Sequence, residues 1–308
     1  MLRLSPHPFS CLPSHPSLAE EEEEEEEAAG EAARPKLEEF LLSILTETQT
    51  FTTQTIPRTF APAPKLRASP PSTAKVQLLL SAGNQNGQGG EGEYWVCRKS
   101  IHADAAEKGT ATWNEFEKGL RENHSENEMA YTPSVASVEH LLQWPVQKEV
   151  KGGWRDVDMH VNMITHTFKP GALISPRTFI SLVISAYEPQ PDNTAAHHQP
   201  GFYTVQIPLS FKTSSANLRE KIKSVVPKNT IFAHYASVEH VSLLDSPPLA
   251  SESANRQRQI EWTMATTSDA GGLIPQWVQR SWTMGGVPKA VVADVGLFLG
   301  WTDRQRRS

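Results

Sequence analysis

The sequence has few of the features that mark secreted, membrane-spanning or nucleic-acid-binding proteins. Its 308 residues include only two cysteines, Cys11 and Cys97, so a disulfide framework is not expected and a reducing, cytoplasmic compartment is favoured. No apolar run approaches the roughly 18–20 residues of a membrane span, and the Pro-broken N-terminus lacks a signal-peptide core. Lys and Arg number 29 against 35 Asp and Glu, so there is no basic excess to bind nucleic acid.

Aromatic residues, prolines and acidic charge are unevenly distributed along the chain. All eight tryptophans lie at or after Trp95, whereas ten of the 23 prolines fall within the first 71 positions. The net charge of −6 is local, because Glu20–Glu27 is an unbroken run of eight acids. We therefore expect residues 1–34 to be a disordered acidic and Pro-rich leader, residues 53–93 to be a Pro- and Gly-rich linker, and residues 94–303 to form one domain.

Residues 35–52, between the leader and the linker, have the spacing of an amphipathic helix. Pro35 suits a first helical position, and the acidic polar face would be repelled by anionic lipid. We expect this helix to dock on the domain, with membrane anchoring as the alternative. Its apolar residues recur at helical intervals: Leu37, Phe40, Leu41, Ile44 and Leu45.

Alternating apolar residues after Tyr94 predict a meander of strands. Strand-like segments lie at about 94–101 and 138–144, and period-2 patterns follow within 157–163, 180–186, 203–211, 231–243 and 260–264. Thr112–Glu115 has the pattern of a capping box that begins a helix. A long helical region runs from Pro275 to about Trp301, interrupted at Gly285–Gly286. This order fits an α+β helix-grip architecture, in which a curved antiparallel sheet wraps around a long C-terminal helix.

The residue types that carry catalysis or metal binding form no recognisable motif. The eleven histidines lack metal-ligand spacing, and no G-x-S-x-G sequence is present, so neither a metal, a cofactor nor an enzymatic activity is expected. Glycines at 87, 89 and 92 precede a strand rather than a helix, which indicates a flexible loop. Glu239 shares strand parity with apolar Val241, so it either anchors a ligand as a buried acid or pairs with a cation near the strand end.

Two loops carry apolar residues at positions where turns are ordinarily polar. Residues 169–177 include Leu173 and Ile174, and residues 268–275 include Leu273 and Ile274, with Trp277 just beyond. These loops either pack into the core as static caps or form a movable lid over an apolar cavity. A lid would allow transient contact with a membrane.

Several motifs occur in the order found in START lipid-binding domains, and the sequence resembles that group. Ser175–Phe179 (SPRTF) resembles the S-P-R-D-F signature, and Gly272–Trp277 (GLIPQW) resembles the G-W-L-P turn before the last helix. More closely, H-S-E-N-E, W-T-M-A-T-T-S-D-A-G-G and D-V-G-L-F-L-G-W resemble an uncharacterised START-like family found mainly in fungi, over about residues 94–303. Thr178 stands where the signature has an acid and Leu273 where it has Trp, so the motifs leave the ligand's identity open.

The resemblance implies a hydrophobic cavity between the sheet and the C-terminal helix. Such a cavity would hold a lipid or sterol-like small molecule without a cofactor, for sensing or for transfer between membranes. Two alternatives stay open: an interaction module whose bulky side chains fill the cavity, and a cyclase-like enzyme using Glu239, Thr165 or Thr167. The candidate lining residues are Met159, Val161, Met163, Ile180, Leu182, Ile184, Val205, Ile207, Tyr235, Glu239, Trp262, Met264, Trp282, Val291 and Val295.

Overall fold

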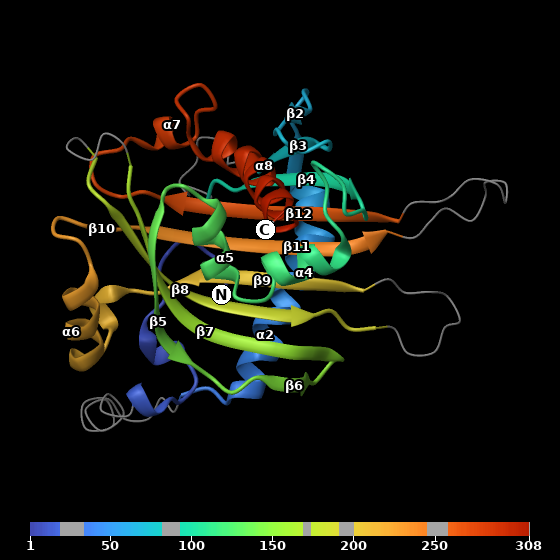
Figure 1. Cartoon of the computed structure of the whole chain (residues 1–308). Coiled ribbons are helices and arrows are strands. Elements are labelled where there is room, and N and C mark those ends of the chain that lie inside the picture. Colours follow the sequence, from blue (N-terminus) through green and yellow to red (C-terminus); the bar gives the residue numbers. More distant parts are fainter. Residues whose placement is uncertain (19–33, 82–92, 169–173, 191–199, 245–257, 308) are drawn as a thin grey trace, which may run out of the picture.

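The computed structural model describes residues 1–18, 34–81, 93–168, 174–190, 200–244 and 258–307. Within these residues, one twelve-stranded sheet carries helices on both faces (Figure 1). Its strands follow the order β1-β3-β4-β12-β11-β9-β8-β7-β5 and run antiparallel, except that β10 pairs in parallel with β8. The predicted α+β class, with a curved antiparallel sheet and a C-terminal helix, is confirmed. The strands are β1 (Phe60–Pro62), β2 (Arg67–Ala68), β3 (Lys75–Ser81), β4 (Val96–Ala103), β5 (Val135–Gln143), β6 (Gln147–Val150), β7 (Trp154–His166), β8 (Arg177–Tyr187), β9 (Gly201–Pro208), β10 (Ile231–Phe232), β11 (His234–Leu244) and β12 (Gln259–Asp269).

Three helices cover one face of the sheet and one long helix covers the other (Figure 1). The first face carries α4 (Trp113–Leu120), α5 (His124–Tyr131) and α8 (Val287–Gln305), and the opposite face carries α2 (Leu37–Thr50). The capping box at α4 is confirmed, because the Thr112 side chain accepts a hydrogen bond from the Glu115 amide. Shorter elements are the 3-10 turns Phe9–Cys11, Pro16–Leu18 and Phe211–Thr213, the π-turn Phe51–Thr55, α3 (Ile56–Thr59), α6 (Ala216–Val225) and α7 (Gln276–Gln279).

The helical region that the sequence predicts from Pro275, with an interruption at Gly285–Gly286, consists of two helices, α7 and α8. Gly285 lies between them with φ +79°, a conformation that favours glycine. A Cβ at Gly286 would lie 2.2 Å from the Gln279 carbonyl oxygen, so the chain passes too close to α7 for a side chain. Pro288 then occupies the first turn of α8, where its missing N–H is not needed.

The core between the sheet and helices α4, α5 and α8 is packed mainly by aromatic side chains. Phe116 of α4 and Phe298 of α8 pack on Trp262 of β12, with ring centroids 5.5 and 5.3 Å apart. Val295 of α8 is fully buried in the same cluster. Each such side chain stabilises the fold by roughly 1.5–3 kcal/mol through burial, so α8 is fixed firmly over this end of the sheet.

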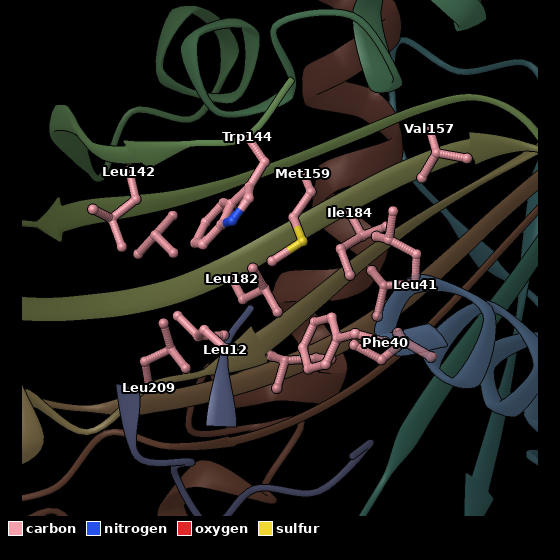
Figure 2. Packing of buried hydrophobic residues seen from close by; sticks show 14 of the residues in the cluster. Leu12, Phe40, Leu41, Leu142, Trp144, Val157, Met159, Leu182, Ile184 and Leu209 are labelled. Carbon is pink, nitrogen blue, oxygen red and sulfur yellow. The ribbon is translucent and has the colours of Figure 1, made fainter. Parts of the chain in front are cut away.

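The opposite face of the sheet forms a second core against α2 (Figure 2). Phe40 and Leu41 of α2 point toward the strands and pack with Leu182, Ile184 and Met159. The structure therefore has the amphipathic helix that the sequence predicts at 35–52, docked on the domain through its apolar stripe.

The leader differs from the sequence expectation over residues 1–18, which are packed rather than disordered. Phe9, Leu12 and Leu18 are fully buried in the core beneath α2, and His7 exchanges backbone hydrogen bonds with the chain at Pro208 and Ser210. These apolar residues sit between prolines without helical or strand periodicity, so no pattern reveals them. Residues 19–33, which contain the whole Glu run, lie outside the described residues.

The segment expected as a linker also differs, because part of it belongs to the sheet. β3 pairs with β4 from Val76↔Ser100 to Leu80↔Val96, and β1 and β2 pair with β3. The hydroxyl of Ser69 lies 2.5 Å from the Val292 carbonyl oxygen and attaches this segment to α8. The neighbouring Pro and Gly residues obscure the short apolar alternation of β3. The glycine-rich loop at 82–92 lies outside the described residues.

Candidate functional site

A partly open cavity of about 280 Å³ lies between the sheet and α8. Strands β7, β8, β9, β11 and β12 form its floor, and α5 and α8 form its roof. Most of the wall is apolar or aromatic, as in binding sites for hydrophobic molecules. The apolar lining includes Ile164, Phe168, Phe179, Met264, Val287 and Val291.

The cavity continues into a smaller polar space of about 30 Å³. Both spaces share a boundary made by α5, α8 and the central strands: Glu128, Thr132, Gln206, Tyr235, Met264 and Asp294 line both. Beyond this boundary lie Arg98 of β4 and Glu239 of β11. The site is therefore amphipathic, with a larger apolar part and a charged inner end.

A buried ion pair forms the floor of the inner end. Arg98 is 1% exposed, and its Nη2 lies 3.4 Å from Glu239 Oε1. Trp262 Nε1 donates to the same Glu239 oxygen at 2.7 Å, and the Arg98 guanidinium lies 3.8 Å from the centroid of the Trp262 ring. Arg98 on β4 and Glu239 on β11 are each paired with Met264 on β12, which lies between those two strands. The register of the sheet therefore fixes the positions of the two charged residues. Among the described residues, Nε and Nη1 of Arg98 have no hydrogen-bond partner.

Two further carboxyl groups face this space from the helices. Burial raises the pKa of Glu128 on α5, and burial likewise raises the pKa of Asp294 on α8 to about 7. Arg98 lowers the pKa of Asp294, whereas the nearby Glu128 and Glu239 carboxyls raise it. Because water cannot solvate these carboxyls fully, both hold a proton more tightly than exposed acids do.

Burial favours the neutral form of two histidines on this side of the sheet. Burial lowers the pKa of His166, which lines the apolar part, to about 4. The same effect, with a contribution from Arg98, lowers the pKa of His102 to about 4. Within the described residues, no group of three or more His, Cys, Asp and Glu side chains is placed to hold a metal ion.

The structure brings together five of the predicted cavity residues and places the others elsewhere. Tyr235, Glu239, Trp262, Met264 and Val291 line the cavity or its inner end, as the sequence predicts. Eight others point to the opposite face of the sheet and pack in the core beneath α2: Met159, Val161, Met163, Ile180, Leu182, Ile184, Val205 and Ile207.

Those eight assignments are corrected because alternation identifies the more apolar face of a strand without showing what covers it. In β8, Phe179 and Ser181 line the cavity, whereas the more apolar Ile180 and Leu182 pack under α2. Two residues of the C-terminal region also lie away from the cavity lining. Val295 is fully buried in the helix-side core, and Trp282 packs against Arg67 on the outer side of α8.

Sequence reasoning missed Arg98, Glu128 and Asp294. The only local signal was Asp294 itself, an acid that interrupts the apolar run of α8. Arg98 and Glu128 lie among ordinary strand and helix residues, and only the tertiary fold places them beside Glu239.

One of the two predicted lid loops borders the cavity. The segment from Ser268 to Val287 begins and ends at cavity-lining residues. Leu273 is 99% exposed and Trp277 is 66% exposed, whereas Ile274 is half-buried. Ile174 in the other loop is also half-buried, and Leu173 lies outside the described residues.

Two larger hollows lie on the molecular surface rather than under α8. One of about 610 Å³ follows α2, and one of about 570 Å³ lies between α8 and the segment around Pro70. The second is lined by the buried Asp303, but that carboxylate already accepts from the Gly109 amide and pairs with Arg306. The cavity under α8 adjoins buried polar atoms of Arg98 and Thr132 that have no partner among the described residues, so it is the better candidate site. None of the helices in the described parts of the chain is long and apolar enough to cross a membrane.

Comparison with known proteins gives a family and a fold. The model of the family described as "Protein of unknown function (DUF3074)" matches residues 95–302. Human STARD10 has a similar crystal structure, with 11% identity and a TM-score of 0.50 over 91% of this chain and 86% of that chain. Human StAR-related lipid transfer protein 5 aligns at 11% identity and a TM-score of 0.45, over 86% of this chain and 95% of that one. No curated protein matches the sequence. The fold is therefore START-like.

Proposed function

The chain belongs to the DUF3074 family, and we propose that it binds a hydrophobic small molecule in the cavity beneath α8, to carry it between membranes or to sense it. The observation that carries this proposal is the cavity itself, a recess of about 280 Å³ with mostly apolar walls and a charged inner end. Removing apolar ligand surface from water would supply the binding energy, at roughly 25 cal/mol per Å². No catalytic step and no cofactor is part of this function.

The positions of the bulky side chains favour a cavity that binds a ligand over one that the protein's own side chains fill. An interaction module would need its Met and Trp residues to occupy the space under α8. Met159 and Met163 instead pack beneath α2, Trp277 is largely exposed, and Trp282 lies outside the cavity. Trp262 and Met264 contribute wall without filling the space.

The exposed segment between β12 and α8 supports transient membrane contact. Leu273 and Trp277 extend into solvent, and Met284 is also exposed. Gly271 and Gly272 adopt φ +61° and +64°, values that favour glycine and allow a sharp turn at the base of this segment. Insertion of these apolar side chains into a bilayer surface would bring the cavity end close to membrane lipid. We also propose a reducing, cytoplasmic setting, which the free thiols of Cys11 and Cys97 support.

Native mass spectrometry of the purified full chain tests the proposal. We expect the protein to carry one small amphiphile, or to acquire one on incubation with a lipid extract. Ala290→Trp, which places a large ring at the solvent-exposed rim of the cavity, should block entry and abolish this adduct. Ala293→Trp is the matched control, because Ala293 lies three residues along the same helix and faces the outer groove. The proposal would be contradicted if the protein carried no ligand either as purified or after incubation with the extract. It would also be contradicted if both variants lost the adduct to the same extent.

A cyclase-like enzyme is the second candidate, and one observation favours it. Asp294 has its pKa raised to about 7 inside the cavity, a value suited to an acid or base near neutral pH. Of the polar candidates from the sequence, Glu239 lies in the site, but Thr165 bonds Thr178 and Thr167 is exposed. Recovery of the bound compound with unchanged mass after long incubation favours a carrier, whereas loss of water from it would favour the enzyme.

A further inference from the structure

Among the described residues, the inner end of the cavity has more acidic groups than basic ones. Arg98 is its permanently charged cation, and His124 also lines it, with Nδ1 3.9 Å from Glu239 Oε2. We call it the acidic end and define it by Arg98, Glu128, Glu239 and Asp294, which come from β4, α5, β11 and α8 and line one space. Arg98 pairs with Glu239. Among the described residues, Glu128 and Asp294 have neither a hydrogen-bond donor nor an ion-pair partner.

Carboxyl groups that are partly shielded from water and lack partners are costly unless a cation or a proton neutralises them. Glu128 and Asp294 are half-buried, and the upward direction of both pKa shifts shows that the ligand-free site disfavours their ionised forms. A positively charged ligand group between them would let both ionise and would form charge-assisted hydrogen bonds, which are stronger than neutral ones. The acidic end is therefore complementary to a cation.

Two other side chains at the acidic end also lack partners and indicate that the space is built for a polar group. Arg98 is 1% exposed with Nε and Nη1 unbonded, and Thr132 is 9% exposed with Oγ1 unbonded, counting only partners in the described part of the chain. Buried polar groups in proteins are ordinarily hydrogen-bonded, so a ligand that bonds here would satisfy them. An anionic head would gain from Arg98 but would face three carboxyl groups.

The apolar part sets the size of the molecule. A volume of about 280 Å³ is at the lower limit for ligand pockets, which suits one chain of medium length or one compact ring system. Two long acyl chains would not fit this space.

We propose that the ligand is an amphiphilic amine, with its ammonium group between Glu128 and Asp294 and its single apolar body along Phe179, Met264 and Val291. This inference rests on the proposed function, because it assigns a chemical class to the ligand of the same cavity. A hydroxyl next to the amine would accept a hydrogen bond from Arg98.

Three probes that share one body and differ in head charge test this inference: n-decylamine, n-decanol and decanoate, titrated into the full chain by calorimetry at pH 7. We expect decylamine to bind at least tenfold more tightly than the other two. Decanol that binds as well as decylamine, or decanoate that binds best, would overturn the inference while leaving the proposed function standing. Failure of all three to bind would overturn both.

Isosteric variants test whether Glu128 and Asp294 cause the preference for decylamine over decanol. Asp294→Asn and Glu128→Gln should each reduce decylamine affinity at least tenfold and leave decanol affinity within twofold, because only the amine needs the charge. Glu126→Gln is the matched control, since Glu126 is on the same helix but pairs with His140 away from the cavity. Circular dichroism confirms that each variant is folded before titration. Unchanged decylamine binding in both folded variants would contradict the assignment of the amine to these carboxyls.

Discussion

Arg177 at the start of β8 donates a hydrogen bond from Nε to the Ala270 carbonyl oxygen, at 3.2 Å. The same guanidinium donates from Nη1 to the Ser175 carbonyl oxygen. Arg177 is almost completely buried and therefore joins the two loops that the sequence marks as lid candidates. Gln279 of α7 reinforces the joint, because its side chain accepts from the Ala270 amide at 2.9 Å and donates to the Ile274 carbonyl oxygen at 3.1 Å.

Arg177→Met should loosen this joint without opening the sheet. Two half-buried carbonyl oxygens, on Ser175 and Ala270, lose a donor, so we expect the free energy of unfolding to fall by roughly 1–3 kcal/mol. Amide hydrogen exchange should become faster over residues 270–286 and stay unchanged in α2. Arg280→Gln, in the same segment but exposed, is the control. Unchanged exchange over 270–286 in Arg177→Met would show that the joint does not restrain the segment.

The exposed apolar side chains of the lid segment should matter for membranes and little for stability. Because Leu273 and Trp277 are mostly in solvent, the double variant Leu273→Asp, Trp277→Asp should change the free energy of unfolding by less than about 0.5 kcal/mol. Extraction of a fluorescent amphiphile from vesicles should slow at least tenfold. Val146→Asp removes an exposed apolar residue in another loop and should have no effect. Equal extraction rates in the parent, the double variant and Val146→Asp would show that the segment plays no part in extracting the ligand from the membrane.

The stability of the ligand-free protein should respond to pH through Asp294. Its pKa is about 7 in the folded state against a usual 3.8, so folding favours the protonated form. The stabilisation from that proton is complete below about pH 4 and is lost as pH rises through 7. Asp294→Asn removes this dependence. We expect the variant to match the parent near pH 4 and to exceed it at pH 8 by up to about 4 kcal/mol, from about 1.4 kcal/mol for each pH unit between the two pKa values.

Two histidines also make the free energy of unfolding depend on pH, but their contributions are the same in the parent and in Asp294→Asn. The pKa values of His102 and His166 are lowered to about 4, so each adds stability as pH rises from about 4 to 6.5. Both histidines are present in parent and variant. Chemical denaturation of the parent and of Asp294→Asn at several pH values therefore isolates the effect of Asp294. A difference in unfolding free energy that does not change with pH would contradict the raised pKa of Asp294.

The N-terminal segment should contribute to the core. Phe9→Ala leaves a cavity beneath α2 and should lower the free energy of unfolding by roughly 3–5 kcal/mol. Leu66→Ala, at an exposed position, should change it by less than about 0.5 kcal/mol. Urea denaturation measures both values. Equal midpoints for Phe9→Ala and the parent would show that residues 1–18 do not pack as described.

The fold could be predicted from the sequence because its strongest signals are local. Period-2 alternation marks β7, β8, β9, β11 and β12, and the capping box at Thr112 marks α4. The packed leader and β3 could not be predicted, since Phe9 and Leu12 have no periodicity and Val76 belongs to a short strand near prolines. Their position depends on contacts with distant residues.

The cavity could be predicted only in part, for a reason specific to this sheet. Both faces are covered. Hydrophobic alternation therefore selects the face beneath α2 in β7, β8 and β9, and the face that holds the cavity only in β11 and β12. Ser181 and Gln206 look solvent-facing in sequence yet line the site. Glu239 was identified because it broke that alternation, and Asp294 carried the same kind of signal within α8.

The most direct test of the central claim is to find where a hydrophobic ligand attaches to the chain. A short alkylamine that carries a photoactivatable diazirine is bound to the full chain, irradiated and mapped by peptide mass spectrometry. The account predicts labelling in α8 near Val287–Val291 and in β8 near Phe179, competed by excess decylamine. Labelling confined to the groove along α2, or labelling that decylamine does not reduce, would contradict it.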